Sequence, residues 1–189
     1  MSQKPELSSF MIPQLLETER LLLRTFVHDD WRALHEHFSD PECTRFTYRR
    51  ALTEAATWRA MASMAGHWLL RGYGPYAVEE KASGTVLGTV GPWYPIEWPE
   101  PEIKWSLAQR HWGKGYASEA VRAVQRMAHD CLPQLRLISL IDSRNEPSIR
   151  LALAVGAALE REIEFAGAPF HIYRHPQSAE QERTEGRAA

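Results

Sequence analysis

Residues 110–117 combine positively charged side chains with two closely spaced glycines, a pattern suited to binding an anion. Gly113 and Gly115 flank Lys114, and Arg110 lies three residues before the first glycine. Glycine lets the backbone approach a ligand without a Cβ in the way. Free N–H groups and the positive end of the dipole favour phosphate where a helix begins. The stretch therefore predicts a cradle for two linked phosphates, with Arg110 and Lys114 adding charge at its rim.

Other interpretations of this stretch are a plain tight turn or a different phosphate motif. A nucleotide P-loop has Gly-x-x-x-x-Gly-Lys-Ser/Thr, whereas Lys114 lies between the glycines with no hydroxyl after it. A dinucleotide fingerprint needs a third glycine where this chain has Ser118. The spacing that fits is Arg110-x-x-Gly113-x-Gly115, and the tight turn stays open as an alternative.

A strand before the glycines and a helix after them would position the cradle. Residues 102–107 alternate as a strand does, with Ile103, Trp105 and Leu107 on one face. After the glycines, small and apolar residues recur every three or four positions, as on a helix with one buried face: Ala117, Ala120, Val121, Val124, Ala128 and Cys131. Strand, turn and helix would aim several N–H groups at one point.

The rest of the chain predicts one mixed sheet with helices on both faces. We expect the further strands at 17–26, 76–80, 85–90, 135–142, 158–165 and 171–174. We expect helices from Trp31 to about 40, capped by residues 28–30, from Thr53 to about Leu70, and from Pro147 to near Gly156. This is a single-domain α/β arrangement over residues 14–176, with a flexible lead-in at 1–13 and a polar, disordered tail at 177–189.

Composition excludes several classes of protein. The 189 residues carry 22 basic and 24 acidic side chains, so the sequence shows no footprint for nucleic acid. The apolar runs are too short for a membrane span, no signal peptide precedes them, and Cys43 and Cys131 have no paired spacing. The histidines show no metal-ligand spacing, so no metal is expected. We expect a cytoplasmic monomer or homodimer that binds neither nucleic acid nor membranes.

Two motifs resemble one family. Arg110-x-x-Gly113-x-Gly115 resembles the Gln/Arg-x-x-Gly-x-Gly/Ala signature of the GNAT superfamily of acyl-CoA-dependent N-acetyltransferases. Residues 112–120 and the opening Thr18-Glu-Arg-Leu strand resemble its ribosomal-protein N-terminal acetyltransferase subgroup. The resemblance covers about residues 17–175. It implies a single-domain, mostly antiparallel mixed sheet with helices on both faces. It also implies acetyl-CoA as co-substrate, bound by Leu107, Arg110, Trp112, Gly113, Lys114, Gly115, Tyr116 and Ala117.

A second block, Asn145-x-x-Ser148-x-Arg150-Leu151, is similar to the segment that borders the pantetheine arm in that family. The resemblance implies that Asn145 bonds the pantetheine or the acceptor, and that Ser148 lies near the thioester sulfur. Alternatively, Asn145 is a turn residue and Ser148 belongs to the first turn of a helix. Many relatives have a Tyr that protonates the departing thiolate where this chain has Ala152. Tyr173, Ser148 or water could be the proton donor instead.

The resemblance implies direct transfer of the acetyl group to an amine in a ternary complex. It makes the amide near Leu107 or Ser106 the donor to the acyl oxygen, and Glu102 a base, directly or through water. Glu102 could equally be a strand-end charge in solvent. The chain could also be a non-catalytic acyl-CoA-binding protein, or an enzyme that binds a nucleotide phosphate.

The loop at 91–101 would then border the acceptor, because it leads into the strand at 102–107. Its aromatic residues and carboxylates would suit a cationic small-molecule amine or a peptide N-terminus: Trp93, Tyr94, Glu97, Trp98 and Glu100. The alternative is a solvated acidic loop whose aromatic rings pack on the sheet.

Overall fold

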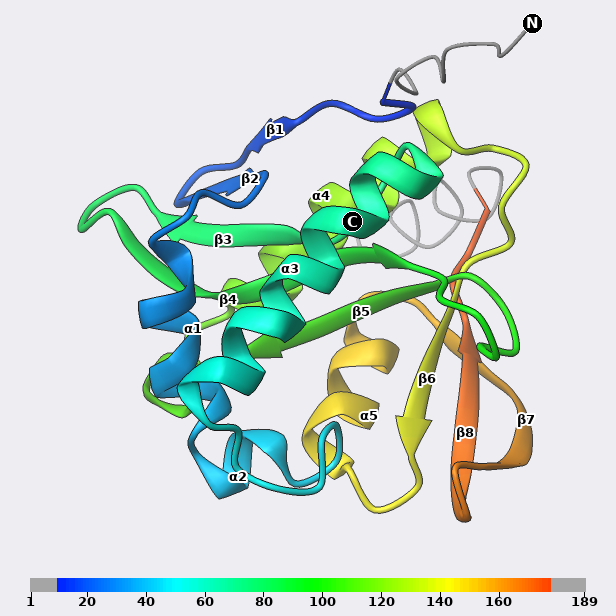
Figure 1. Cartoon of the computed structure of the whole chain (residues 1–189). Coiled ribbons are helices and arrows are strands. Elements are labelled where there is room, and N and C mark those ends of the chain that lie inside the picture. The colour runs from blue at the N-terminus through cyan, green and yellow to red at the C-terminus, as the bar shows by residue number, and fades with distance from the viewer. Residues whose placement is uncertain (1–9, 178–189) are drawn as a thin grey trace, which may run out of the picture.

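The computed structural model describes residues 10–177. Most of the lead-in predicted at 1–13 and of the tail predicted at 177–189 lies outside the described residues. Eight strands form one sheet in the order β1-β2-β3-β4-β5-β6-β8-β7 (Figure 1). All neighbouring pairs are antiparallel except β5 and β6, which are parallel. The prediction of a mixed, mostly antiparallel sheet is confirmed.

The strands are β1 (Leu15–Glu17), β2 (Leu21–Arg24), β3 (Tyr76–Glu80), β4 (Thr85–Trp93), β5 (Glu102–Leu107), β6 (Ile138–Asp142), β7 (Ala158–Phe165) and β8 (Ala168–Arg174). The helices are α1 (Asp30–Phe38), α2 (Pro41–Thr44), α3 (Glu54–Arg71), α4 (Tyr116–Cys131) and α5 (Glu146–Ala154), with a 3₁₀ turn η1 (Gln109–His111). None of these helices, within residues 10–177, has the length and apolar character needed to cross a membrane.

Helices cover both faces of the sheet (Figure 1). On one face α1 and α3 pack together over β3 and β4, with Leu34, Phe38 and Met64 among the buried residues. On the other face α4 buries Val121 and Val124 against the central strands. The short helix α5 joins α4 on that face and packs its buried Ala152 against β6 and β8. Strand β5 therefore has α1 on one side and α4 and α5 on the other.

Several predicted boundaries were wrong for identifiable reasons. The strand predicted at 17–26 is a hairpin of β1 and β2, because the Thr18 hydroxyl accepts the amide of Leu21 and closes a turn. Residues 28–30 were expected to cap α1, but the Asp30 carboxylate instead accepts the amide of Val27 and two bonds from Arg24. Strand β6 begins at Ile138 rather than at residue 135, and the single turn α2 was not predicted. The helix predicted from Thr53 to about Leu70 is confirmed as α3, and the Thr53 hydroxyl caps it by accepting the amide of Ala56.

Candidate functional site

The turn between η1 and α4 is open on the side where a ligand would lie. Gly113 and Gly115 have φ of 72° and 79°, a left-handed conformation that favours glycine. A Cβ added at Gly113 would meet no atom within 4 Å. Within residues 10–177 no side chain caps α4, so the amides of its first turn, residues 116–118, have no helical partner. The turn therefore presents backbone donors to open space, as a phosphate cradle requires.

Side chains at the rim of the turn point in different directions. Lys114 and Trp112 are exposed, and the Trp112 indole donates to the carbonyl of Leu107 at 2.7 Å. That bond ties the turn to the end of β5. Arg110 pairs with Glu36 of α1 at 2.6 Å, so its guanidinium leans toward α1 rather than over the glycines.

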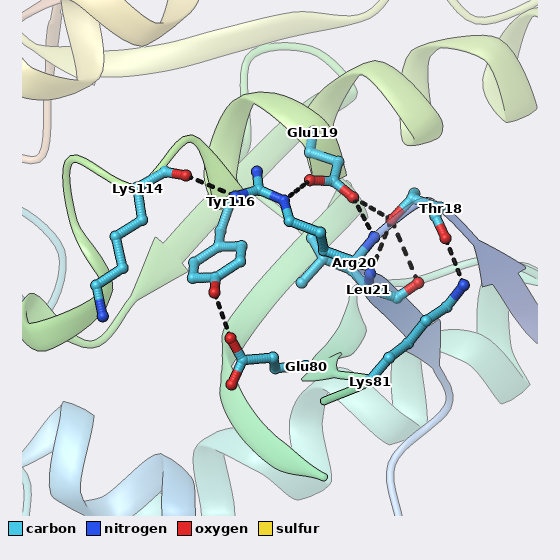
Figure 2. A network of polar contacts seen from close by, with 8 residues as sticks. All are labelled: Thr18, Arg20, Leu21, Glu80, Lys81, Lys114, Tyr116 and Glu119. Atoms are coloured by element: carbon cyan, nitrogen blue, oxygen red, sulfur yellow. Dashed lines mark hydrogen bonds and ion pairs between the residues drawn. The ribbon is translucent and has the colours of Figure 1, made fainter. Parts of the chain in front are cut away.

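A polar network fastens the cradle to the β1–β2 hairpin (Figure 2). The Glu119 carboxylate, in the first turns of α4, accepts from the Thr18 hydroxyl at 2.6 Å and from Arg20 Nε at 2.7 Å. Arg20 Nη1 donates to the carbonyl of Lys114 at 2.9 Å, and its guanidinium lies 4.5 Å from the centre of the Tyr116 ring. Tyr116 in turn donates its hydroxyl to Glu80.

This network sets the direction of one cradle amide. In a trans peptide the carbonyl of residue 114 and the N–H of Gly115 point in opposite directions. Because Arg20 holds the carbonyl, the N–H of Gly115 faces away from Arg20. Burial raises the pKa of Glu119, but the bonds from Thr18 and Arg20 outweigh it and leave that pKa below its usual value. Glu119 is thus a stable anion anchoring the turn.

The parallel strands β5 and β6 separate after a single paired position, Glu102 with Ile138. Beyond that position, side chains form hydrogen bonds with backbone groups that would otherwise pair the two strands. The Glu102 carboxylate accepts the amide of Leu140 at 3.1 Å, and the Ser139 hydroxyl donates to the carbonyl of Ile103 at 2.7 Å. The two strands diverge toward Leu107, and this separation is called the β5–β6 opening below.

The amide of Leu107 points into the β5–β6 opening. On the other edge of β5, the amide of Ala108 donates to the carbonyl of Leu87 in β4 at 2.9 Å. Because successive amides of a strand alternate in direction, that of Leu107 faces away from β4. Strand β4 also approaches closely here, since a Cβ on Gly88 would lie 2.1 Å from the carbonyl oxygen of Ser106.

Glu102 lies at the start of the opening and is only 5% exposed. One carboxylate oxygen accepts the Trp98 indole N–H at 2.8 Å, and the other accepts the amide of Leu140. Burial raises the pKa of Glu102, against the effect of nearby Lys104 and of these two donors. The interpretation of Glu102 as a strand-end charge in solvent is wrong.

Asn145 and Ser148 lie on the α4 and α5 side of the opening. The Asn145 side chain accepts the amide of Ser148 at 3.3 Å and so caps α5. The Trp105 indole donates to the Ser148 hydroxyl oxygen at 3.2 Å, which brings Ser148 against β5. Tyr173 is 4% exposed and packs with Ala152 in a cluster that Trp105 also contacts, and burial raises its pKa.

The opposite face of β5 carries a different group of polar residues under α1. His37 is 2% exposed, and its Nε2 lies 2.6 Å from the Ser106 hydroxyl. Burial, with smaller effects of Lys104 and Arg110, lowers the pKa of His37 to about 4 in spite of Asp40. Lys104 Nζ lies 4.9 Å from the centre of the Trp93 ring. The His37–Ser106 pair could not be predicted from the sequence, because it joins residues 69 apart.

The loop at 91–101 does not present a free cage of aromatic rings and carboxylates. The ammonium group of Lys104 lies 4.9 Å from the centre of the Trp93 ring, and the guanidinium of Arg71 lies 4.8 Å from the centre of the Tyr94 ring. The carboxylate of Glu100 pairs with Arg161 at 2.6 Å and with Arg174 at 2.7 Å. Side chains of the protein itself already satisfy these groups. Within residues 10–177, no three His, Cys, Asp or Glu side chains are grouped so as to hold a metal ion.

Comparison with known proteins gives a consistent set of similarities. The family described as "Acetyltransferase (GNAT) domain" matches residues 20–158. The N-acetyltransferase p20 of Bacillus licheniformis is 33% identical over 140 residues, which are 73% of this chain and 79% of p20. An acetyltransferase structure from Agrobacterium tumefaciens C58 is 28% identical with a TM-score of 0.78, over 92% of this chain and all of the other. The fold also resembles RimL, a ribosomal L7/L12 alpha-N-protein acetyltransferase solved with coenzyme A (TM-score 0.69, 18% identity, covering 89% of this chain and 98% of that one).

Proposed function

Because the chain belongs to the GNAT acetyltransferase family, and is therefore an acetyl-CoA-dependent N-acetyltransferase, we propose that it acetylates a primary amine by direct attack in a ternary complex. The acceptor is a small molecule or a peptide N-terminus. One observation carries this proposal. An uncapped helix start with an open glycine turn lies beside a strand whose Leu107 amide faces the β5–β6 opening.

The donor side of the proposal rests on the cradle. The amides of residues 115–118 would hold the diphosphate of acetyl-CoA, and the open space at Gly113 leaves room for it. Lys114 and Trp112 would border it, and the fixed carbonyl of Lys114 keeps the amide of Gly115 turned inward. From there the pantetheine arm would run along α5, past Asn145 and Ser148, to the opening.

The proposed chemistry needs few side chains, because acyl transfer from a thioester depends mainly on positioning. The Leu107 amide would stabilise the developing oxyanion. Since the Trp105 indole occupies a lone pair of the Ser148 oxygen, the Ser148 proton is free to bond the departing sulfur. Free thiols have a pKa near 8.5, so this bond would assist departure without being obligatory.

Glu102 remains our proposed base, acting through water. Its raised pKa increases its affinity for a proton, which suits a general base. Five residues of strand span roughly 17 Å, so Glu102 cannot touch an amine bound at Leu107. Glu102→Gln should therefore lower kcat more than it raises KM. An equal effect on acetyl-CoA affinity would instead indicate that Glu102 only shapes the opening.

A thiol-release screen tests the proposed function. Acetyl-CoA is incubated with the full chain and a panel of primary amines, amino sugars and N-terminal peptides, and coenzyme A release is followed with a thiol reagent. At least one acceptor should raise release well above the rate of hydrolysis, and mass spectrometry should find the acetyl group on its nitrogen. Binding of acetyl-CoA in calorimetry without release for any amine would contradict transfer and favour a binding protein.

A further inference from the structure

Ser106 is the polar side chain of β5 that adjoins the proposed oxyanion donor, Leu107. Alternation along the strand turns Ser106 toward α1, away from the face where Trp105 contacts Ser148. Ser106 is half-buried, whereas His37 behind it is closed off from solvent. Of the two residues, Ser106 is therefore the one that a ligand can reach.

The hydrogen bond between these two residues has a preferred polarity. His37 Nδ1 is buried and has no partner within residues 10–177. A buried N–H without an acceptor is rarer in proteins than an unfilled lone pair. The proton of the neutral imidazole therefore belongs on Nε2, which donates to the Ser106 oxygen. Ser106 keeps its second lone pair and its own proton for another partner.

Other polar groups on this face are poorly placed to meet an acceptor at Leu107. The Glu102 oxygens already accept two hydrogen bonds, five residues away. Lys104 is held over the Trp93 ring, and burial lowers its pKa. Thr89 lies opposite Ser106 on β4, but it is fully buried. Among these side chains of β4 and β5, Ser106 is left as the one placed to meet an acceptor at Leu107.

We propose that Ser106, oriented by His37, binds the nitrogen of the acceptor amine on the α1 side of the β5–β6 opening. This inference rests on the proposed function and names the acceptor half of its site. The Ser106 lone pair would accept one N–H of the neutral amine, which leaves the nitrogen lone pair to face the thioester carbon. Ser106 is thus a catalytic residue, and His37 a positioning residue that acts through it.

The step balances without a further reactant. The nitrogen forms a bond to the acyl carbon, and the bond from that carbon to sulfur breaks with its electron pair leaving on sulfur. The nitrogen gives its surplus proton through water to Glu102, which returns it to solvent. The thiolate takes a proton from solvent, and the products are an amide and a thiol. A neutral His37 suits this step, because an imidazolium would repel the positive charge that develops on nitrogen.

Steady-state kinetics with the acceptor found in the screen test this assignment. Ser106→Ala should lower kcat/KM for the amine about tenfold, while the Kd of acetyl-CoA in calorimetry stays within about twofold of wild type. His37→Phe keeps a planar aromatic ring but removes the donor, and should cause a similar loss. The double variant should lose little more than either single variant, because both changes remove one interaction. Ser106→Thr, which retains a hydroxyl, should recover part of the activity.

Thr89→Val is the matched control, since it removes a buried hydroxyl directly opposite Ser106 and should leave the amine kinetics unchanged. Wild-type amine kinetics in Ser106→Ala would overturn the assignment and leave the proposed function intact. Equal losses for the amine and for acetyl-CoA would also overturn it, by showing a structural effect on β5. A wild-type chain that releases no thiol with any amine would overturn the proposed function and this assignment together.

Discussion

The two faces of β5 present different kinds of polar group, backbone amides on one and buried side chains on the other. On the α4 side the proposed coenzyme contacts are mainly backbone amides, held by an exposed network of charges in which the side chain of Arg20 is 42% exposed. On the α1 side the polar groups are side chains, and His37 and Glu102 are each at most 5% exposed. The donor side should therefore respond to changes in backbone shape and local charge. The acceptor side should respond to pH and to the loss of single hydroxyl groups.

The largest effect is expected from acid, and it should come from the acceptor side. Burial holds the pKa of His37 at about 4, below its ordinary value of 6.5. A lowered histidine pKa contributes stability above pH 6.5 that is lost as the pH falls toward 4, because the unfolded chain takes up the proton first. The loss is on the order of 3 kcal/mol across that range.

Urea unfolding at pH 7, 5.5 and 4.5 measures this loss. His37→Phe should flatten the dependence on pH, while His28→Asn, which changes an exposed histidine, should not. His175 is also buried, and its pKa of about 3 leaves a residual slope in every variant. If His37→Phe and wild type show the same slope, His37 is not held neutral by burial.

The second effect belongs to the donor side. Gly113→Val would place a branched side chain in the open space of the turn, at a φ that valine rarely adopts. We expect the Kd of coenzyme A to rise roughly 100-fold, about 2.7 kcal/mol, with a smaller loss of stability from the backbone. Gly167→Val is the control, because Gly167 has the same φ of 72° and open space around it, in the turn between β7 and β8 away from the cradle. Equal affinity in Gly113→Val and wild type would exclude the cradle.

The sequence predicted the donor side better than the acceptor side, and the reason is distance along the chain. The strand at 102–107, the glycine turn and the helix that follows are continuous, so their periodicity and turn chemistry could be read directly. The sheet type and most strands followed in the same way. Arg20 and Lys114 meet across 94 residues, and His37 and Ser106 across 69. No local pattern encodes such contacts, and the two interpretations of the aromatic loop stayed open because Lys104 and Arg71 could not be placed on its rings from the sequence.

The smallest effect is expected from a substitution that changes the backbone of the cradle and leaves the rest of the donor site intact. Arg20→Gln removes the bonds to Glu119 and to the carbonyl of Lys114, so the peptide before Gly115 can rotate. We expect KM for acetyl-CoA to rise about tenfold, or 1.4 kcal/mol, with kcat changed less. An acetyl-pantetheine thioester lacks the diphosphate, and its kinetics should be the same in the variant and in wild type. Arg161→Gln is the matched control. Arg161 is similarly exposed, and it pairs with Glu160 of β7 and with Glu100 in the loop before β5, away from the turn. If Arg20→Gln impairs acetyl-CoA and the acetyl-pantetheine thioester equally, Arg20 stabilises the fold in general. The difference between the two faces of β5 then does not depend on how the Gly115 amide is held.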